Sequence, residues 1–386
     1  MPGAGHEHER ALARRLLSLC LSPGSVPAAT RAAASGAHTN DWDSLIGFAI
    51  RQGVAPLLAV RTRHLSIPVQ FRERLEAIYS ANSIRNLRFA AEESRLCAAM
   101  ASAGLRHWPL KGPGLSEKLY ADIGVRQISD LDLLIEPASL AQADALLAEL
   151  GYRRNTQGDI ASLSRAQQLM YVCDARSSFT YYLDLHQGLL PYVRRDALAA
   201  RVFAAGPGKM SGENQLLYLC ANQVTHRFAR LRYLCDVTAF LEREAASVEW
   251  KGFVATARKM AWGPGVGLSL QWAAEFAPGR VPQHVLRALR PSRVGEMLLR
   301  RTVGADAAEA ASRTRLLDGP RGASAVISAA YAGAAQLNVA WRVAFPTEAY
   351  IREQTGAPAG HEAIPAYAGR IARKIPKVVR YLLKNS

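Results

Sequence analysis

Two aspartates lie one residue apart in the apolar stretch "RQISDLDLLIE", residues 126–136. Side chains two positions apart on a β-strand point to the same side, so Asp130 and Asp132 would share one face while Leu131 and Leu133 face a core. Two neighbouring carboxylates repel each other unless a cation lies between them. Mg²⁺ takes oxygen ligands and commonly binds one or two carboxylates together with substrate phosphates. The pair therefore predicts a Mg²⁺ site, with Mn²⁺ as the alternative ion.

A third carboxylate lies in "FTYYLDLHQGL", residues 179–189, whose aromatic and alternating character predicts a second strand. Asp184 and His186 would share one face of it. If the two strands are neighbours, Asp184 joins Asp130 and Asp132, and three carboxylates can hold two metal ions for an in-line displacement at phosphorus. For His186 two interpretations stay open: a functional group beside the metal, nucleotide or acceptor, or a hydrogen-bonded structural histidine.

A glycine-containing loop, "LKGPGL", lies upstream of the aspartates. Gly112 and Gly114 allow backbone N–H groups to approach a phosphate closely, and Lys111 adds a positive charge. A short helix predicted over 115–120 can direct its N-terminus at the same anion. Arg126, just before the aspartate pair, can bind a phosphate oxygen. These residues predict a phosphate-binding site next to the metal site.

The elements that must position these residues begin with helices. Apolar residues recur at helical spacing in 9–21, in "NDWDSLIGFAIRQG" and in the long stretch 69–103, which predicts one or two helices. Asn40 or Asp41 is the expected N-cap of the second of these helices. The first hundred residues are therefore predicted to be all-helical.

The pattern changes to mixed α/β at Gly104. The segment "LRHWPLKGPG" predicts a strand that ends in a glycine turn. Between the two aspartate-bearing strands, "PASLAQADALLAELGY" opens with Pro137 and stops at Gly151, as a helix does. The prediction is an α+β fold: a small mixed-sheet core over 104–210, flanked by helical regions over 1–103 and 211–386.

The C-terminal region returns to helical spacing at 213. About nine turns of helix follow if the segment is continuous, and a break within Asn222 to Arg227 is the alternative. Arg232 and Asp236 are four residues apart, so they either pair on one helix face, or Arg232 approaches the phosphate or base of a nucleotide. The basic tail "GRIARKIPKVVRYLLKNS" is expected to form a helix that packs on the protein, with binding to an anionic membrane as the alternative.

Composition narrows the class of protein. The net charge of +16 favours anionic partners such as nucleotides or nucleic acid, although the abundance of arginine in this Ala/Arg-rich chain also explains it. Five cysteines, with no Cys-x-x-Cys pair, favour buried thiols over disulfides or a cysteine-rich zinc site. No signal peptide or membrane span is recognised, so a cytoplasmic protein is expected.

The ordered set of glycine loop, helix, Asp-x-Asp strand, helix and third-aspartate strand resembles the nucleotidyltransferase superfamily with the polymerase-β-like core. The segments "PLKGPGLSEKLY", "RQISDLDLLI", "LLAELGY" and "LDLH" are more closely similar to a bacterial branch, the uncharacterised nucleotidyltransferase family. The resemblance continues into "THRFARLRYLCDV" and, more loosely, into "DWDSLIGFAIRQGVAPLL" and "FPTEAYIRE".

The resemblance implies transfer of an NMP from an NTP to an acceptor, with release of pyrophosphate. Asp130, Asp132 and Asp184 would bind metal, and Asp184 would also help to deprotonate the acceptor. Lys111 and its neighbouring glycines would face the triphosphate. The acceptor stays open: a protein side chain, a small molecule or RNA.

One position departs from the superfamily pattern. The first glycine is usually followed by serine, but Pro113 follows Gly112 here and offers no hydroxyl. A catalytically inactive protein that binds nucleotide or acts as a scaffold is therefore kept as an alternative. A nucleotidyltransferase that modifies RNA is a further alternative, suggested by the positive charge.

Overall fold

The structure is a computed structural model that describes residues 3–21, 39–155, 168–174, 179–190, 196–206, 210–226, 228–260, 263–291, 296 and 303–312. The basic C-terminal tail and "FPTEAYIRE" lie outside these residues. In the described part, five strands form one mixed sheet in the order β1-β2-β5-β4-β3. Their bounds are β1 His107–Pro109, β2 Leu131–Ile135, β3 Arg153–Arg154, β4 Gln168–Cys173 and β5 Tyr181–His186. Strands β2 and β5 are parallel, and the other neighbours are antiparallel.

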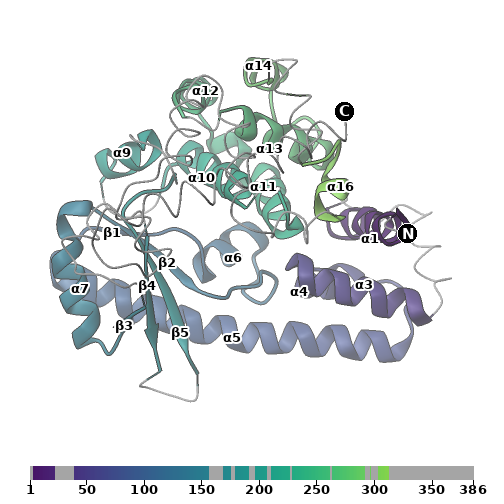
Figure 1. The fold of residues 1–386 in the computed structure, drawn as a ribbon, viewed down its shortest axis with the longest axis horizontal. Helices are drawn as coiled ribbons and strands as arrows, with labels where there is room; N and C mark the ends of the chain where they lie inside the picture. The colour runs from purple at the N-terminus through teal and green to yellow at the C-terminus, as the bar shows by residue number, and fades with distance from the viewer. Residues whose placement is uncertain are drawn as a thin grey trace, which may run out of the picture.

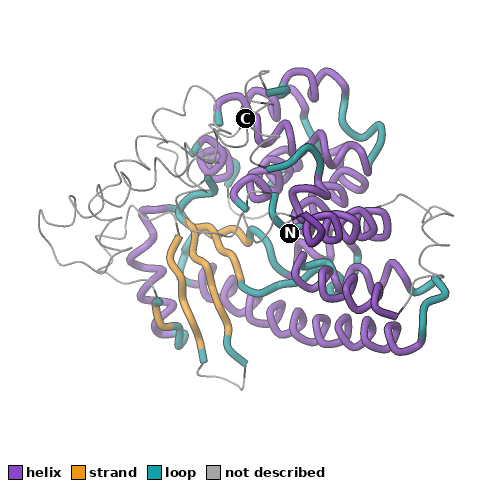
Figure 2. Tube along the Cα trace, turned by 45° about the vertical axis from the view of Figure 1, so that its right-hand side comes forward, coloured by secondary structure: helices purple, strands orange, loops and turns teal. Residues whose placement is uncertain are grey.

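One face of the sheet packs against two helices, α5 (Val69–Ser102) and α7 (Leu140–Glu149). In Figure 1 the long helix α5 runs behind the strands, and Figure 2 shows helices on both sides of them. Side chains alternate between the two faces of a strand, so every second residue of β2 and β5 points to this face. Leu131 and Leu133 of β2 and Leu183 and Leu185 of β5 are accordingly fully buried in the same apolar cluster. The predicted orientation of the two leucines of β2 is confirmed.

A second apolar cluster joins the two ends of the described chain. The N-terminal helices α1 (Gly3–Leu21), α3 (Thr39–Gln52) and α4 (Ala55–Thr62) share it with the C-terminal helices. Trp108 and Leu134, on the other face of the sheet, belong to this second cluster. Helices from both ends of the described chain therefore share one core.

The remaining described helices are α6, which lies between β1 and β2, and those that come after β5 in the chain. They are α6 Pro113–Tyr120, α9 Ala197–Ala204, α10 Gly212–Thr225, α11 Leu231–Glu244, α12 Trp250–Lys259, α13 Gly263–Phe276, α14 Gln283–Ala288 and α16 Ala307–Ser312. Short 3₁₀ turns cover Pro137–Ser139 and Ala245–Ser247. The α+β class is confirmed. The segment that the sequence left either continuous or broken has the break, between α10 and α11. The division into three regions stays a prediction.

Several local expectations need correction. Asp130 precedes β2 and is not part of the strand, because the ladder begins at Leu131. Helix α3 begins at Thr39, so neither Asn40 nor Asp41 is the residue that precedes it. Strands β3 and β4 were not predicted. The stretch 69–103 forms a single helix of 34 residues.

The five cysteines are free thiols, and all except the half-buried Cys97 are buried. Among the helices described, none combines the length and apolar character that a bilayer crossing requires.

Candidate functional site

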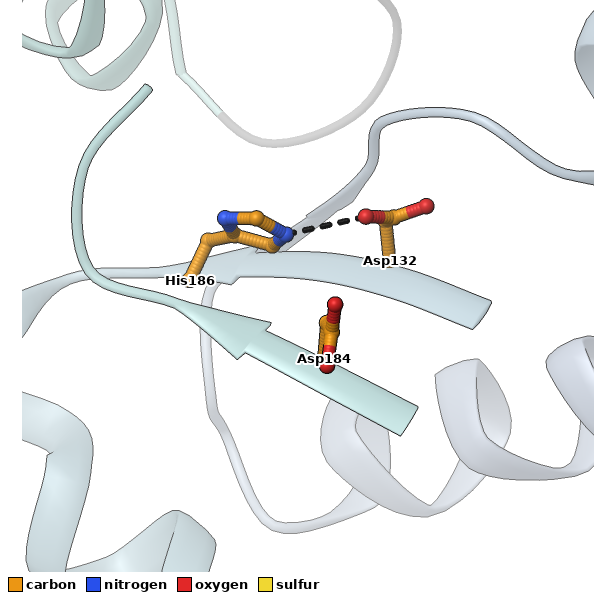
Figure 3. A group of neighbouring side chains, drawn as sticks. All are labelled: Asp132, Asp184 and His186. Atoms are coloured by element: carbon orange, nitrogen blue, oxygen red, sulfur yellow. Dashed lines mark hydrogen bonds and ion pairs between the residues drawn. The ribbon is translucent and has the colours of Figure 1, made fainter. Parts of the chain in front are cut away.

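The parallel pairing of β2 and β5 brings together three side chains that could hold a metal ion. Asp132 lies directly across from Asp184 in the register of the two strands, and His186 is two residues farther along β5 on the same face. One ligand atom from each of the three lies within 4.8 Å of the others (Figure 3). The cluster includes a histidine that the sequence left between two interpretations.

Asp132 is the buried centre of this cluster. Its side chain is 3% exposed, and its Oδ1 accepts contacts of 2.9 Å from both Lys111 Nζ and His186 Nε2. Burial by itself favours the neutral acid, but the positive charge of Lys111 and the contact with His186 hold the pKa of Asp132 well below its usual range. Asp132 is therefore a carboxylate that stays ionised.

Asp184 is electrostatically different. Burial and the charge of Asp132 raise its pKa to about 6. Gln168 on β4 donates a hydrogen bond of 2.5 Å to Asp184 Oδ2. The repulsion between the two carboxylates is relieved by a cation held between them, so the donor set of two carboxylates and one imidazole fits a divalent metal ion.

Asp130 lies at the edge of this group. It lines the same cavity as Asp132 and Asp184, but it is not among the three residues whose ligand atoms converge. Its Oδ1 accepts a hydrogen bond of 3.0 Å from Ser129 Oγ. Of the three carboxylates predicted to bind metal, those of Asp132 and Asp184 lie close enough together to share one ion. The third, that of Asp130, lies on the cavity wall.

The residues of the glycine loop have different surroundings in the structure. Lys111 lines the cavity, whereas Gly112 and Gly114 do not. Gly112 has φ +100° and precedes α6, whose first residue, Pro113, needs no N–H partner. A Cβ at Gly112 would lie 2.7 Å from Glu93 Oε2. The glycine at this position is explained by its backbone conformation and by the closeness of α5.

Glu93 is a carboxylate that sequence reasoning missed. Its Oε2 is buried with no hydrogen-bond partner, and burial together with the charge of Asp132 raises its pKa to about 7. It follows Glu92 on a helix with abundant charge, so no pattern in the sequence distinguishes it.

The wall opposite the sheet comes from the end of α10 and the start of α11. Six residues of this wall line the cavity: Tyr218, Asn222, Thr225, His226, Arg232 and Tyr233. Helical spacing explains the first three, which recur at four and three residues on one side of α10. Of these six residues, sequence reasoning singled out Arg232, and it missed the polar side of α10 that carries Tyr218, Asn222 and Thr225.

The two predicted arginines have different surroundings. Arg126 is buried and pairs with Asp236 through Nε, at 3.0 Å from Oδ2, while it also lines the cavity. Arg232 therefore does not have Asp236 as its ion-pair partner. Its Nη2 donates to Tyr233 Oη at 2.7 Å, and its buried Nε has no hydrogen-bond partner among the residues that the structure describes. The roles of both arginines in nucleotide binding stay predictions.

Polar residues of α5 fix the loop that leads into β2. Asn82 Nδ2 donates to the carbonyls of Gly124 and Arg126, and Asn86 Nδ2 donates to that of Arg126 at 2.8 Å. These hydrogen bonds restrain a loop that forms no strand-to-strand hydrogen bonds of its own. The approach of Asp130 to the cavity therefore depends on a helix that is 40 residues upstream.

Comparison with known proteins gives one family match. The family model described as "uncharacterised nucleotidyltransferase" matches residues 38–278, which include every cavity residue named above. Searches of curated proteins and of solved structures give no match. Because the match spans more than half of the chain and contains the metal-binding cluster, this protein belongs to the uncharacterised nucleotidyltransferase family.

Proposed function

We propose that this protein transfers an NMP from an NTP to an acceptor, with release of pyrophosphate. The observation that carries the proposal is the convergence of Asp132, Asp184 and His186 in a cavity that also holds Lys111 and Arg232. Carboxylates suited to a divalent ion, next to cations suited to phosphate, are the requirements of phosphoryl-type transfer. Membership of the nucleotidyltransferase family supports the same reaction.

In this proposal Asp132, Asp184 and His186 hold Mg²⁺, and Asp130 supplies oxygen for a second ion. When bound, the ions would polarise the α-phosphate and stabilise the charge of the leaving pyrophosphate. An acceptor hydroxyl or similar group attacks the α-phosphorus, the bond to the bridging oxygen of the β-phosphate breaks, and the acceptor proton passes to Asp184. Mn²⁺ would substitute for Mg²⁺.

The chain's cations act on the phosphates. Lys111 is positively charged because Asp132 offsets the effect of burial and raises its pKa. Arg232 has an unpaired buried Nε that a phosphate or ribose oxygen would satisfy. Arg126 acts through its charge, since its guanidinium is bound to Asp236. Gly112 and Gly114 would contribute through the position of the α6 N-terminus.

The test uses Asp132→Asn and Asp184→Asn with NTPs labelled at the α-phosphate, Mg²⁺ and a cell lysate as the source of acceptor. We expect label transfer by the unaltered protein and a loss of at least about 100-fold in each variant, because removal of one electrostatic stabiliser of this kind commonly has that effect. Asp174→Asn is the matched control, since Asp174 is an exposed carboxylate paired with Arg153. Label transfer at full rate by Asp184→Asn would contradict the proposal.

The inactive alternative is favoured by one observation. Pro113 occupies the first position of α6, and no hydroxyl is available where the superfamily usually has serine. A protein of that kind would gain thermal stability with Mg²⁺ and an NTP, yet release no pyrophosphate with any of the four NTPs and lysate. Pyrophosphate release that depends on lysate would exclude it.

A further inference from the structure

The α10–α11 wall of the cavity holds a stacked ring pair next to an unpaired amide. The rings of His226 and Tyr233 are parallel within 9°, with centroids 4.4 Å apart, and the His226 side chain is exposed. Asn222 is only 7% exposed and lines the cavity. Within the described parts of the chain, its amide has no hydrogen-bond partner. The amide is not among the fully buried unpaired groups, so it is accessible from the cavity, where a ligand or water can bond to it.

The positions of these residues along α10 relate them to the metal-binding cluster. Tyr218, Asn222 and His226 recur every four residues, so they lie on one side of the helix. Tyr218 interacts with Lys111, which is bound to Asp132. With the helical rise per residue, Asn222 is about 6 Å and His226 about 12 Å farther along the axis from Tyr218. The amide and the ring therefore extend along the cavity wall from the residue that interacts with Lys111, and His226 remains within electrostatic range of Lys111 and Asp132.

Arg232 also contacts the stacked pair. The guanidinium carbon of Arg232 lies 4.7 Å from the centroid of the Tyr233 ring, and Arg232 Nη2 bonds to the hydroxyl of the same residue. A Cβ at Gly53 would lie 2.8 Å from Arg232 Cδ, so the arginine stem is packed against α3. A platform that is fixed before a ligand arrives binds planar rings with little loss of side-chain entropy.

We propose that this wall is the nucleobase subsite of the protein: the base of the NTP stacks on the open face of His226, and the Asn222 amide hydrogen-bonds to its edge. The inference rests on the proposed function, because it takes the NTP phosphates to lie at Asp132 and Asp184. It assigns a ligand, the nucleobase, to residues that have no role in binding the metal ion. Stacking is indifferent to base identity, whereas the amide selects the base edge.

The first experiment measures the Kd of the four NTPs and of inorganic tripolyphosphate, each with Mg²⁺, by calorimetry on the full chain. Tripolyphosphate keeps the phosphates and lacks the base. We expect His226→Ala to weaken NTP binding by about 5- to 150-fold, which is the equivalent of about 1–3 kcal/mol for one base stack, and to leave tripolyphosphate binding unchanged. His226→Phe, which keeps an aromatic face, should restore NTP binding. His64→Ala is the matched control, since His64 is exposed and is not a cavity residue.

The second experiment changes the hydrogen-bonding character of the amide. Asn222→Asp replaces a donor and an acceptor by two acceptors of almost the same shape. Guanine is the base whose edge presents two adjacent donors, so we expect the affinity for GTP to rise relative to the other three NTPs. Asn222→Ala should reduce the differences among the four NTPs.

The outcomes separate the two proposals. Equal affinity for tripolyphosphate and NTPs, or equal loss of both in His226→Ala, would overturn the base subsite and leave the phosphate and metal sites intact. An unchanged order of the four affinities in Asn222→Asp would overturn the role of the amide. Absence of binding by every NTP and by tripolyphosphate would instead overturn the proposed function.

Discussion

Asp132, Asp184 and the nearby Glu93 differ in protonation behaviour because each has different neighbours. Asp132 is bound to Lys111 and stays ionised. Asp184 is largely buried and faces Asp132, so its pKa rises to about 6, and Gln168 donates a hydrogen bond to it. Glu93, behind the glycine loop, has neither a cation nor a donor at its buried Oε2. Acids whose surroundings separate their pKa values in this way are typical of functional sites.

Glu93 leads to a pH-dependent prediction. Its folded-state pKa of about 7 lies above the reference value of 4.5. At pH values between these two pKa values, folding is therefore accompanied by the uptake of a proton. The stability that the neutral acid contributes is complete below pH 4.5 and is lost as the pH rises through 7. Glu93→Gln, which stays neutral, should match the unaltered protein near pH 4.5 and exceed it by about 1–3 kcal/mol at pH 8. Urea denaturation at a series of pH values checks this, and a difference that does not change with pH would contradict it.

At the scale of elements, the site depends on contacts between different helices and strands. Strands β2 and β5 align Asp132 with Asp184. Helix α5 holds the loop before β2 through Asn82 and Asn86. The end of α3 fixes the start of α11, because Gln52 Oε1 accepts a hydrogen bond of 3.0 Å from the Leu231 N–H. Each contact restrains a backbone segment that carries a cavity residue.

Gly53, just after α3, gives a prediction at this scale. It has φ +71°, and a Cβ there would lie 2.8 Å from Arg232 Cδ. We expect Gly53→Ala to destabilise the protein by about 1–3 kcal/mol through backbone strain and to weaken NTP binding through displacement of Arg232. Thermal unfolding and calorimetry with Mg²⁺ and NTP measure the two effects.

Gly47, in the interior of α3, provides the matched control. Its added Cβ would meet nothing closer than 3.9 Å. Because alanine is the better helix former, Gly47→Ala should stabilise the protein by about 0.5–1 kcal/mol and leave NTP binding unchanged. Equal effects of the two substitutions would show that Gly53 has no special conformational role.

At the scale of the whole molecule, a buried ion pair joins the sheet region to the C-terminal helices. Arg126 lies before β2 and Asp236 lies on α11, and both side chains are less than 10% exposed. Tyr120 Oη donates a hydrogen bond of 3.0 Å to the same carboxylate. The two walls of the cavity are therefore connected by one charged cluster, which explains why residues far apart in sequence share a site.

Asp236→Asn tests this connection. Removal of one partner leaves the Arg126 charge buried without compensation, so we expect a loss of about 3–5 kcal/mol in the free energy of unfolding. Urea denaturation measures it. Asp174→Asn, which breaks an exposed pair with Arg153, should cause no measurable change. Equal stability of Asp236→Asn and the unaltered protein would mean that the pair contributes nothing to joining the two walls.

The sequence by itself determined the α+β class and the strand that carries Asp184, because these follow from periodicity and from turn residues close in the chain. It left the segment that forms α10 and α11 either continuous or broken. It also determined that Asp184 and His186 share one face of their strand, since side chains alternate along any strand, but it left open whether this strand lies beside the one that carries Asp132. It did not determine that Asp130 lies outside the ladder, because hydrogen-bond pairing with β1 and β5 sets where β2 begins.

Only the tertiary structure decided the partners. Lys111 pairs with Asp132, Arg126 with Asp236, and His226 stacks on Tyr233, whereas the sequence allowed a phosphate-facing lysine and an Arg232–Asp236 pair. Such choices depend on which elements pack together, and that packing is set by the burial of apolar side chains far apart in sequence. A local sequence pattern determines which face of a helix or strand a residue occupies. Which residue lies across the cavity from it depends on the apolar core, whose packing brings the two walls together.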